Sequence, residues 1–519
     1  MNTHTSLGRR LVAALGAAAL GLVGVVGVAN AAVGPDQPNH PTTGTLTIHK
    51  LDGAQGAASD GTEQNVAGTP LNGVKFTIWQ LGTENGEGTC VALNTSTIDD
   101  WDKVPTGAAP ATTAQVEAAG YCLVNAGGTT GTTAGQGAYT FSGLDLGLYY
   151  VQETDASGAT NATTGKSANV VSESAPFYVS IPLPTANDWL YDVHAYPKNQ
   201  TLDAPVKTIN DDAAQPGNGV VVGSVVEWTI TQKVPALNDG ESYNSASIWD
   251  VLPASLAYNA TKSVTLNGET LTEGADYKID ADGVTWTLTG ALDDIKAGDV
   301  ITVTFTTKVL SVTATGDIAN PGSNGDEPGY GSEFNGTKTP GEPTPYTYWG
   351  QLSILKTDDS TPVKNLAGAE FKVFLPAADD TCAATAPTDG SEVATGTSNA
   401  SGIVEWEDLD PDANNTVLGL WVANSENGAL TDPSKNYCVY ETVVPAGHTA
   451  VPFTTKQTIK PGTDNVNAFT VVNSKKNGPD LPLTGANGQL LALIGGGALV
   501  LLAGGTALVA RNRRHQNQD

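Results

Sequence analysis

One lysine stands where a strand-like run ends in proline: DWLYDVHAYPKN, Asp188 to Asn199, in which Lys198 is next to last. Proline has no backbone N–H and interrupts strand pairing, so we expect Lys198 at a domain edge, within reach of another protein. A lysine amine must lose its proton before it attacks an acyl group, and partial shielding beside Trp189 and Tyr196 would favour the neutral amine. Taken alone, the residue is better interpreted as a surface lysine that follows a strand.

The N-terminal residues predict export. Arg9 and Arg10 precede an apolar run that closes with the small-residue site Ala29-Asn30-Ala31, the pattern of a signal peptide over residues 1–31. Over the whole chain 54 acidic residues face 25 basic ones, a formal net charge of −29. Such an acidic surface disfavours nucleic-acid binding and suits a soluble exterior outside the cell.

The C-terminal residues predict attachment to the cell surface. An apolar run from Leu490 to Ala510 is long enough to span a bilayer, and the arginine-rich tail after it would stay in the cytoplasm. This run alone would indicate a membrane-anchored ectodomain. It is preceded by LPLTG, which resembles the LPxTG sorting signal of Gram-positive surface proteins, cleaved by a sortase between threonine and glycine. The sorting residues are Leu481, Pro482, Leu483, Thr484 and Gly485.

The cysteines and histidines favour cross-linking over catalysis. The cysteines form two local pairs, Cys90 with Cys122 and Cys382 with Cys438. Three connectivities are open, and pairing within each local pair is favoured because each pair lies inside one predicted module of an exported chain. The histidines of the exported part are scattered, without an HExxH, GxSxG or metal-ligand pattern. We therefore expect two disulfides, no metal site, no cofactor and no enzyme with turnover.

Short alternating runs between turn-rich segments, such as VKFTIWQL, VEWTITQKV and ITVTFTTKV, predict an all-β protein made of sandwiches. A weak repeat relates LTIHKLD and YYVQET, early in the chain, to LSILKTD and YCVYET near its end. The segment between the two copies has a different spacing, and proline-rich connections support its boundaries. We predict three tandem β-sandwich domains at residues 32–199, 200–348 and 349–478, followed by the sorting signal, a transmembrane segment and a basic tail at 479–519.

Together these features resemble a shaft (major) pilin of sortase-assembled Gram-positive pili, in particular the type 1 and type 2 fimbrial subunits of Actinomyces. The resemblance covers the whole chain, with signal, pilin motif, tandem domains, E-box and sorting signal in the family's order. It implies an elongated rod of immunoglobulin-like, Cna-type domains. It also implies that the motif lysine attacks the sortase acyl-enzyme and is joined through its amine to the Thr484 carbonyl of a neighbour. The pilin motif is matched by Trp189, Val193, Tyr196, Pro197 and Lys198.

The resemblance further implies an internal Lys–Asn isopeptide bond in the third, CnaB-like domain. Its E-box YCVYETVVPAGH supplies Glu441, and Lys356 and Asn473 match the first-strand lysine and last-strand asparagine. Burial must make the lysine a neutral amine and the carboxyl a proton donor to the asparagine, while the strands hold amine and amide in contact. Ammonia then leaves. The alternative is a buried Lys356–Glu441 ion pair, which would be a poor source of stability.

The other two domains match the pattern less fully. In the middle, CnaA-like domain the resemblance implies Lys207, Asp250 as the acid and Asn320 in GDIAN, although the family's following alanine is replaced by Gly322. Asn335 is the fallback asparagine.

The N-terminal domain has Lys50 and an E-box-like Glu153, but Tyr196 stands where the repeat would place the asparagine. We expect no isopeptide bond there, and a domain held by packing and the Cys90–Cys122 disulfide.

The resemblance implies a structural shaft subunit of a covalent, wall-anchored surface fimbria that supports adhesion. The implied partners are identical subunits, a pilus-specific sortase, peptidoglycan through a housekeeping sortase, a tip pilin, and a host surface protein or glycan. A monomeric wall-anchored adhesin would keep LPLTG without needing Lys198, and a minor or basal pilin is a further alternative. A surface enzyme is disfavoured by the scattered histidines, His40, His49, His194 and His448.

Overall fold

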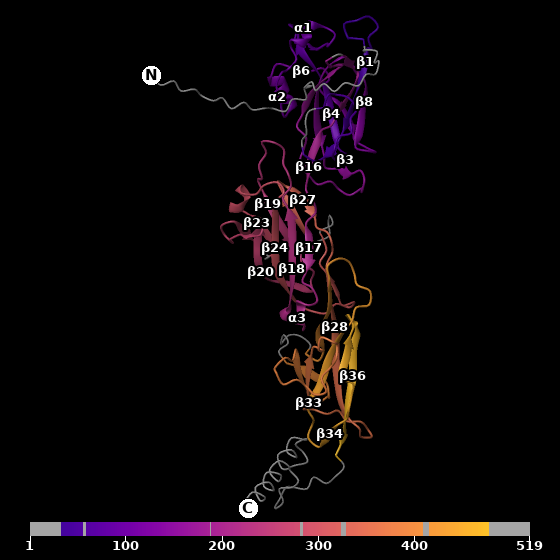
Figure 1. The fold of residues 1–519 in the computed structure, drawn as a ribbon, viewed down its shortest axis with the longest axis vertical. Helices are drawn as coiled ribbons and strands as arrows, with labels where there is room; N and C mark the ends of the chain where they lie inside the picture. Colours follow the sequence, from indigo (N-terminus) through magenta and orange to yellow (C-terminus); the bar gives the residue numbers. More distant parts are fainter. Residues whose placement is uncertain are drawn as a thin grey trace, which may run out of the picture.

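The computed structural model describes residues 33–54, 59–186, 188–280, 284–322, 329–407 and 415–476. Figure 1 shows three β domains arranged end to end in a rod, with the N-terminal domain at the top. This confirms the predicted all-β rod of three sandwiches. The expected signal peptide, LPLTG motif and transmembrane segment lie outside the described residues. Within the described ranges, no helix is both long and apolar enough to cross a membrane.

The N-terminal domain consists of short strands and two short helices. Its elements are β1 (Thr43–His49), β2 (Leu51–Asp52), β3 (Thr69–Asn72), β4 (Lys75–Glu84), β5 (Cys90–Ala92), α1 (Ile98–Trp101), α2 (Thr113–Ala118), β6 (Cys122–Leu123), β7 (Thr129–Thr132), β8 (Ala138–Asp145), β9 (Gly147–Asp155), β10 (Thr160–Asn161), β11 (Val170–Ser172), β12 (Phe177–Ile181), β13 (Leu183–Pro184), β14 (Trp189–Leu190), β15 (Asp192–Ala195) and β16 (Lys198–Thr201). The main sheets have the orders β15-β1-β8, β10-β3-β2-β16-β11 and β12-β9-β4-β5.

Two apolar clusters hold this domain together. Side chains alternate across a strand, so Leu46 and Ile48 of β1 point into the main core, where Phe76 and Val151 are also buried. A second cluster, which includes Trp79, lies under the insertion that carries both helices. The disulfide Cys90–Cys122 closes this insertion, with its Cα atoms 5.8 Å apart. The expected N-terminal pairing is confirmed.

The middle domain is a sandwich of two five-stranded sheets, with the orders β17-β18-β24-β20-β21 and β22-β23-β19-β26-β27. Its largest buried side chains are aromatic and include Trp228, Trp286 and Phe305. The elements are β17 (Val206–Ile209), α3 (Gln215–Asn218), β18 (Val225–Lys233), β19 (Ala246–Asp250), β20 (Leu256–Leu266), β21 (Glu269–Thr270), β22 (Tyr277–Ile279), β23 (Thr285–Leu288), a 3-10 helix η1 (Gly290–Asp293), β24 (Val300–Val309), β26 (Tyr330–Phe334) and β27 (Thr337–Pro340).

The third domain is also a sandwich, with sheet orders β25-β28-β36-β34 and β31-β30-β29-β33-β35, and with β32 paired to β28. Its long strands β28 and β36 run parallel. The expected disulfide Cys382–Cys438 is present. The elements are β25 (Asp317–Ala319), β28 (Tyr346–Asp358), β29 (Glu370–Phe374), β30 (Ala394–Ser398), β31 (Val404–Trp406), β32 (Leu418–Ser425), β33 (Lys435–Val443), β34 (His448–Ala450), β35 (Lys456–Ile459) and β36 (Gly462–Lys475).

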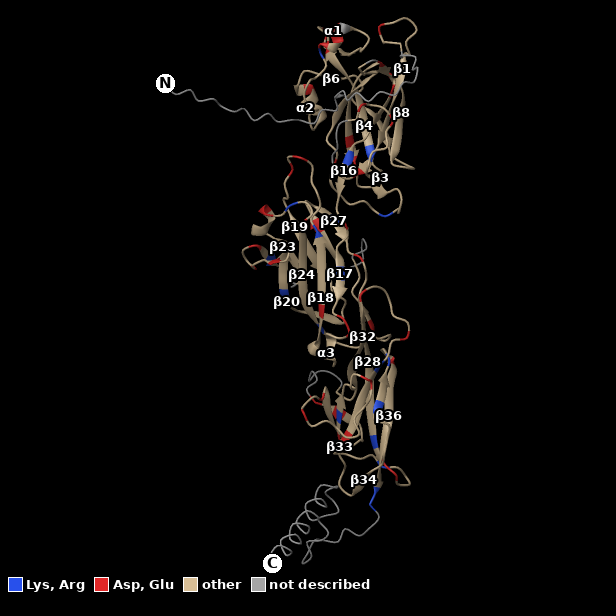
Figure 2. Ribbon diagram, in the orientation of Figure 1, with Lys and Arg blue, Asp and Glu red and all other residues tan. Residues whose placement is uncertain are grey.

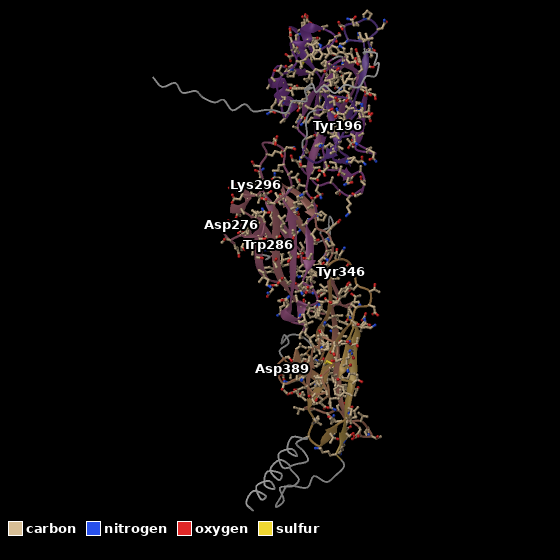
Figure 3. All side chains as sticks on the ribbon, in the orientation of Figure 1. Tyr196, Asp276, Trp286, Lys296, Tyr346 and Asp389 are labelled. Atoms are coloured by element: carbon tan, nitrogen blue, oxygen red, sulfur yellow. A yellow bond between two sulfur atoms is a disulfide. The ribbon has the colours of Figure 1, made fainter. Side chains whose placement is uncertain are left out.

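The two domain junctions differ in character. One continuous apolar core runs from the middle domain into the third, and Tyr346, at the start of β28, lies at this junction (Figure 3). Backbone bonds join the two domains there: Val222 N–H donates to Gly419 O at 3.0 Å, and Trp421 N–H donates to Val220 O at 2.8 Å.

The first junction is largely polar and includes an ion pair of 2.7 Å between Lys166 and Glu342. Asn169 Nδ2 also donates to Thr339 Oγ1 across it at 2.6 Å. Acidic residues mark loops of all three domains (Figure 2).

Candidate functional site

Lys198 is the first residue of strand β16, and this strand lies at the end of the N-terminal domain next to the middle domain (Figure 1). The preceding strand β15 ends at Ala195, so the Tyr196-Pro197 pair separates two strands, as proline's missing N–H requires. Lys198 therefore begins a new strand, whereas the sequence predicted that it follows the final strand of the domain. β16 runs parallel to β2, with Lys198 opposite Leu51.

The side chain of Lys198 is partly shielded from solvent. Its side chain is half-buried, and none of the described residues forms a hydrogen bond or ion pair with its amine. Of the two aromatic residues expected beside it, Trp189 packs against Trp101 and Tyr196 stacks on His49 at 4.7 Å. An amine without a bound carboxylate is free to meet an incoming acyl group.

The residue after Lys198 points the opposite way, because successive side chains of a strand alternate. Asn199 is fully buried and meets Lys50 and Glu153, which are also buried. Lys50 Nζ lies 2.8 Å from Glu153 Oε2 and 2.5 Å from Asn199 Oδ1. Asn199 Nδ2 donates to Glu153 Oε1 at 2.6 Å. Burial lowers the pKa of Lys50 to about 8, against the opposing effect of Glu153.

The reasoning that denied this domain an acceptor asparagine was therefore wrong. The repeat aligned Tyr196 with Asn473 as if both last strands were continuous. The interruption at Pro197 restarts the strand and brings Asn199 to the buried lysine instead. The signal was present in the sequence, since an asparagine directly after the motif lysine must face the other side of the strand.

The middle domain assembles its predicted trio in a fully buried site. Lys207 Nζ, from β17, lies 2.8 Å from Asp250 Oδ2 at the end of β19. Asn320 Nδ2, just after β25, donates to the same Asp250 oxygen at 3.0 Å. Desolvation lowers the pKa of Lys207 to about 8 and raises the pKa of Asp250. The Tyr330 ring centre lies 4.1 Å from the amine, which restricts water around it.

The fallback asparagine, Asn335, lies elsewhere and makes other contacts. Asn335 has a positive φ of 50° in a turn, and its side chain caps the backbone of Asn244 and Ser242 away from the lysine. A close contact with Gly341 explains why position 322 is glycine. A Cβ there would lie 1.8 Å from Gly341 O, so the alanine of the resembling family would not fit this loop.

The third domain also brings its predicted residues together. Lys356 Nζ is 3.9 Å from Glu441 Oε1, and Asn473 Nδ2 donates to Glu441 Oε2 at 2.9 Å. The amine donates to the carbonyls of Thr357 and Val471, each at 3.0 Å. Burial lowers the pKa of Lys356 and raises the pKa of Glu441, so both charged forms are disfavoured.

These sites share a chemical capability. Each holds a buried amine, a carboxyl group and a primary amide together, with the carboxyl bonded to the amide nitrogen. Such an arrangement supplies proximity between nucleophile and carbonyl and a proton for the leaving nitrogen. Among the described residues, the amide oxygens of Asn320 and Asn473 have no hydrogen-bond partner. The Asn199 oxygen has partners.

Comparison with known proteins decides the family. The chain is 32% identical, over its full length and 99% of the relative's, to fimbrial subunit type 2 of Actinomyces naeslundii. This chain belongs to the fimbrial subunit family of Gram-positive bacteria. It is also 29% identical to fimbrial subunit type 1 of Actinomyces viscosus, with 99% of each chain covered. Family models match residues 41–200 as a Gram-positive pilin subunit D1, N-terminal domain, and residues 203–321 as an Sgo0707 N2 domain.

The fold and the anchor agree with membership of this fimbrial family. The full-length major pilin SpaD from Corynebacterium diphtheriae is similar, with a TM-score of 0.58 and 25% identity over 84% of this chain and 98% of SpaD. Residues 473–517 match the LPXTG cell wall anchor motif. The protein is thus a structural subunit of a wall-anchored surface fimbria, and the predicted family, fold class and location are confirmed.

Proposed function

We propose that this fimbrial subunit forms the covalent shaft through an amide between Lys198 of one copy and the Thr484 carbonyl of the next. The observation that carries the proposal is the position of Lys198, half-buried at the start of β16 with no carboxylate of the described residues bound to its amine. The LPXTG match supplies the other end of the link. A pilus-specific sortase would cleave after Thr484 and transfer the acyl group to Lys198.

The proposal includes an internal amide in every domain, formed without an enzyme. The lone pair of the lysine Nζ attacks the asparagine Cγ, the C–Nδ2 bond breaks, and the nitrogen leaves as ammonia. The carboxyl group relays one proton from the amine to that nitrogen. The pairs would be Lys50 with Asn199, Lys207 with Asn320 and Lys356 with Asn473. Glu153, Asp250 and Glu441 would be the respective acids, supported by the contacts that join each to its amide.

The fimbria would also need partners at its base and at its tip. The final subunit would be joined to peptidoglycan by a housekeeping sortase, and a tip pilin and a host protein or glycan would complete the fimbria. The alternative, a monomeric wall-anchored adhesin, keeps the sorting signal and makes no use of Lys198.

The test replaces Lys198 by alanine and by arginine, neither of which offers an acylable amine. Wall fractions of both variants, boiled in detergent and reductant, should show single subunits where the native protein gives a ladder. Lys278→Ala, at an exposed lysine of β22, is the matched control and should keep the ladder. Ladders of native size from both Lys198 variants would reject the intermolecular link. Intact mass then tests the internal amides, each of which removes one ammonia.

A further inference from the structure

The amide site of the N-terminal domain contains a hydrogen-bond donor that the described residues do not supply at the other two sites. Ser174, in the connection between β11 and β12, donates its backbone N–H to Asn199 Oδ1 at 2.7 Å. The amide oxygens of Asn320 and Asn473 have no such partner in the described part of the chain. When an amine attacks an amide, the carbonyl oxygen becomes negative, and a fixed N–H aimed at it stabilises the transition state.

Ser174 also holds the acid of this site. Its hydroxyl donates to Glu153 Oε2 at 2.6 Å, and its backbone N–H lies 3.1 Å from the same oxygen. The residue is buried. One residue thus contacts both the oxygen that gains charge and the carboxyl group that moves the proton.

The peptide group that supplies this N–H is held in place by a hydrogen bond from the middle domain. Its other end is the Glu173 carbonyl, which accepts a hydrogen bond of 2.6 Å from Asn238 Nδ2. A peptide unit is planar with C=O and N–H opposed, so fixing the carbonyl fixes the direction of the Ser174 N–H. Accepting a bond at the carbonyl also polarises the N–H and strengthens it as a donor.

Further contacts hold the same segment to the same loop. Ser172 Oγ donates to Glu241 Oε2 at 2.5 Å, and Asn238 N–H lies 3.2 Å from Ser172 Oγ. Both Asn238 and Glu241 belong to the middle domain, in the connection between β18 and β19. The Ser174 peptide is therefore oriented by a neighbouring domain and by its own.

We infer that Ser174 is a catalytic residue for the Lys50–Asn199 amide, with its N–H as oxyanion donor, and that Asn238 of the middle domain is its positioning residue. The inference rests on the proposed internal amide of the N-terminal domain. Lys50 Nζ attacks Asn199 Cγ, the carbonyl electron pair moves onto Oδ1 beside Ser174 N–H, and its return expels Nδ2 as ammonia. The first domain therefore closes its amide faster once it has docked on the second.

The test follows each amide separately in one chain. The full mature chain is recovered unfolded, refolded, and sampled over time by proteolysis and mass spectrometry of the three cross-linked peptides. Removing one oxyanion donor typically slows a reaction about 10²–10³-fold, and Asn238 acts through such a donor, so Asn238→Ala should slow the Lys50–Asn199 amide at least about tenfold. The other two amides, as internal controls, should keep their rates.

Two variants separate orientation from folding. Asp239→Ala changes the adjacent exposed residue and should leave all three rates unchanged. Asn238→Gln keeps an amide donor and should recover at least part of the lost rate, with the Cys90–Cys122 disulfide formed throughout. An unchanged first-domain rate in Asn238→Ala, or equal slowing in Asn238→Gln, would overturn the inference. A native chain that never forms the Lys50–Asn199 peptide would overturn the proposed amide itself, which is a distinguishable result.

Discussion

The rate of amide formation in the middle domain should be constant over a range of pH and should fall at both lower and higher pH. The reactive pair must hold one proton between the Lys207 amine and the Asp250 carboxyl. With two protons the amine cannot attack, and with none the acid cannot donate. Moving that single proton between the two groups leaves the proton count unchanged, so it adds no pH dependence of its own.

The pKa of Lys207 sets the pH above which the rate should fall. Burial lowers the pKa of Lys207 from 10.5 to about 8, which disfavours the ammonium form by about 3 kcal/mol. Burial also raises the pKa of Asp250 above its ordinary 3.8. Between the pKa of Asp250 and the pKa of Lys207, most molecules hold one proton on this pair. Above about pH 8 it loses its proton, and the rate should fall about tenfold for each further pH unit.

The assay refolds the unfolded mature chain at values from about pH 5 to about pH 10 and measures the initial rate of the Lys207–Asn320 peptide by mass spectrometry. Asp250→Asn, which cannot supply the proton, should form no bond at any pH. A rate that keeps rising to the top of this range, as for an exposed lysine acting without an acid partner, would refute the shared-proton reasoning.

Further predictions concern stability and the loop geometry. Trp421→Ala should cost about 3–5 kcal/mol in denaturant unfolding, measured in a chain without internal amides, because this fully buried ring sits at the shared core of two domains. Replacing Cys382 and Cys438 by alanine should cost about 4 kcal/mol in the same assay, since the bond closes a separation of 56 residues. Gly322→Ala should slow the Lys207–Asn320 amide and leave the other two unchanged, as its Cβ would lie 1.8 Å from Gly341 O and displace the loop that carries Asn320. Site-resolved mass spectra that show equal rates would contradict it.

Much of the fold could be predicted from the sequence because it depends on local patterns. Alternating strands, the internal repeat and two close cysteine pairs each report on neighbours along the chain, and the structure confirms them. Lys356, Glu441 and Asn473 could be named because LSILKTD, YCVYETVVPAGH and FTVVNSKK resemble pilin motifs, and the three residues lie in β28, β33 and β36.

The rest depends on register and on contacts between distant segments. The break at Tyr196-Pro197 places Asn199, and not Tyr196, beside Lys50, and alignment of the two repeat copies does not show this change of register, although the alternation after Lys198 does. Ser174 and Asn238 lie in connections, where side-chain periodicity is absent, and they meet only because two domains dock. The ring contacts of Trp189 with Trp101 and of Tyr196 with His49 also join distant segments and could not be predicted.

The position of Lys198 at the very end of its domain decides which parts of the subunit bear tension. In the proposed covalent shaft, a pull from one neighbour would enter at residue 198 and leave at residue 484, so the residues before Lys198 would lie outside the path of tension. With the internal amides formed, force crosses from Lys207 to Asn320 and from Lys356 to Asn473 without stretching the strands between them. In that arrangement, tension in the backbone would be confined to residues 198–207, 320–356 and 473–484, and the other strands would not be stretched.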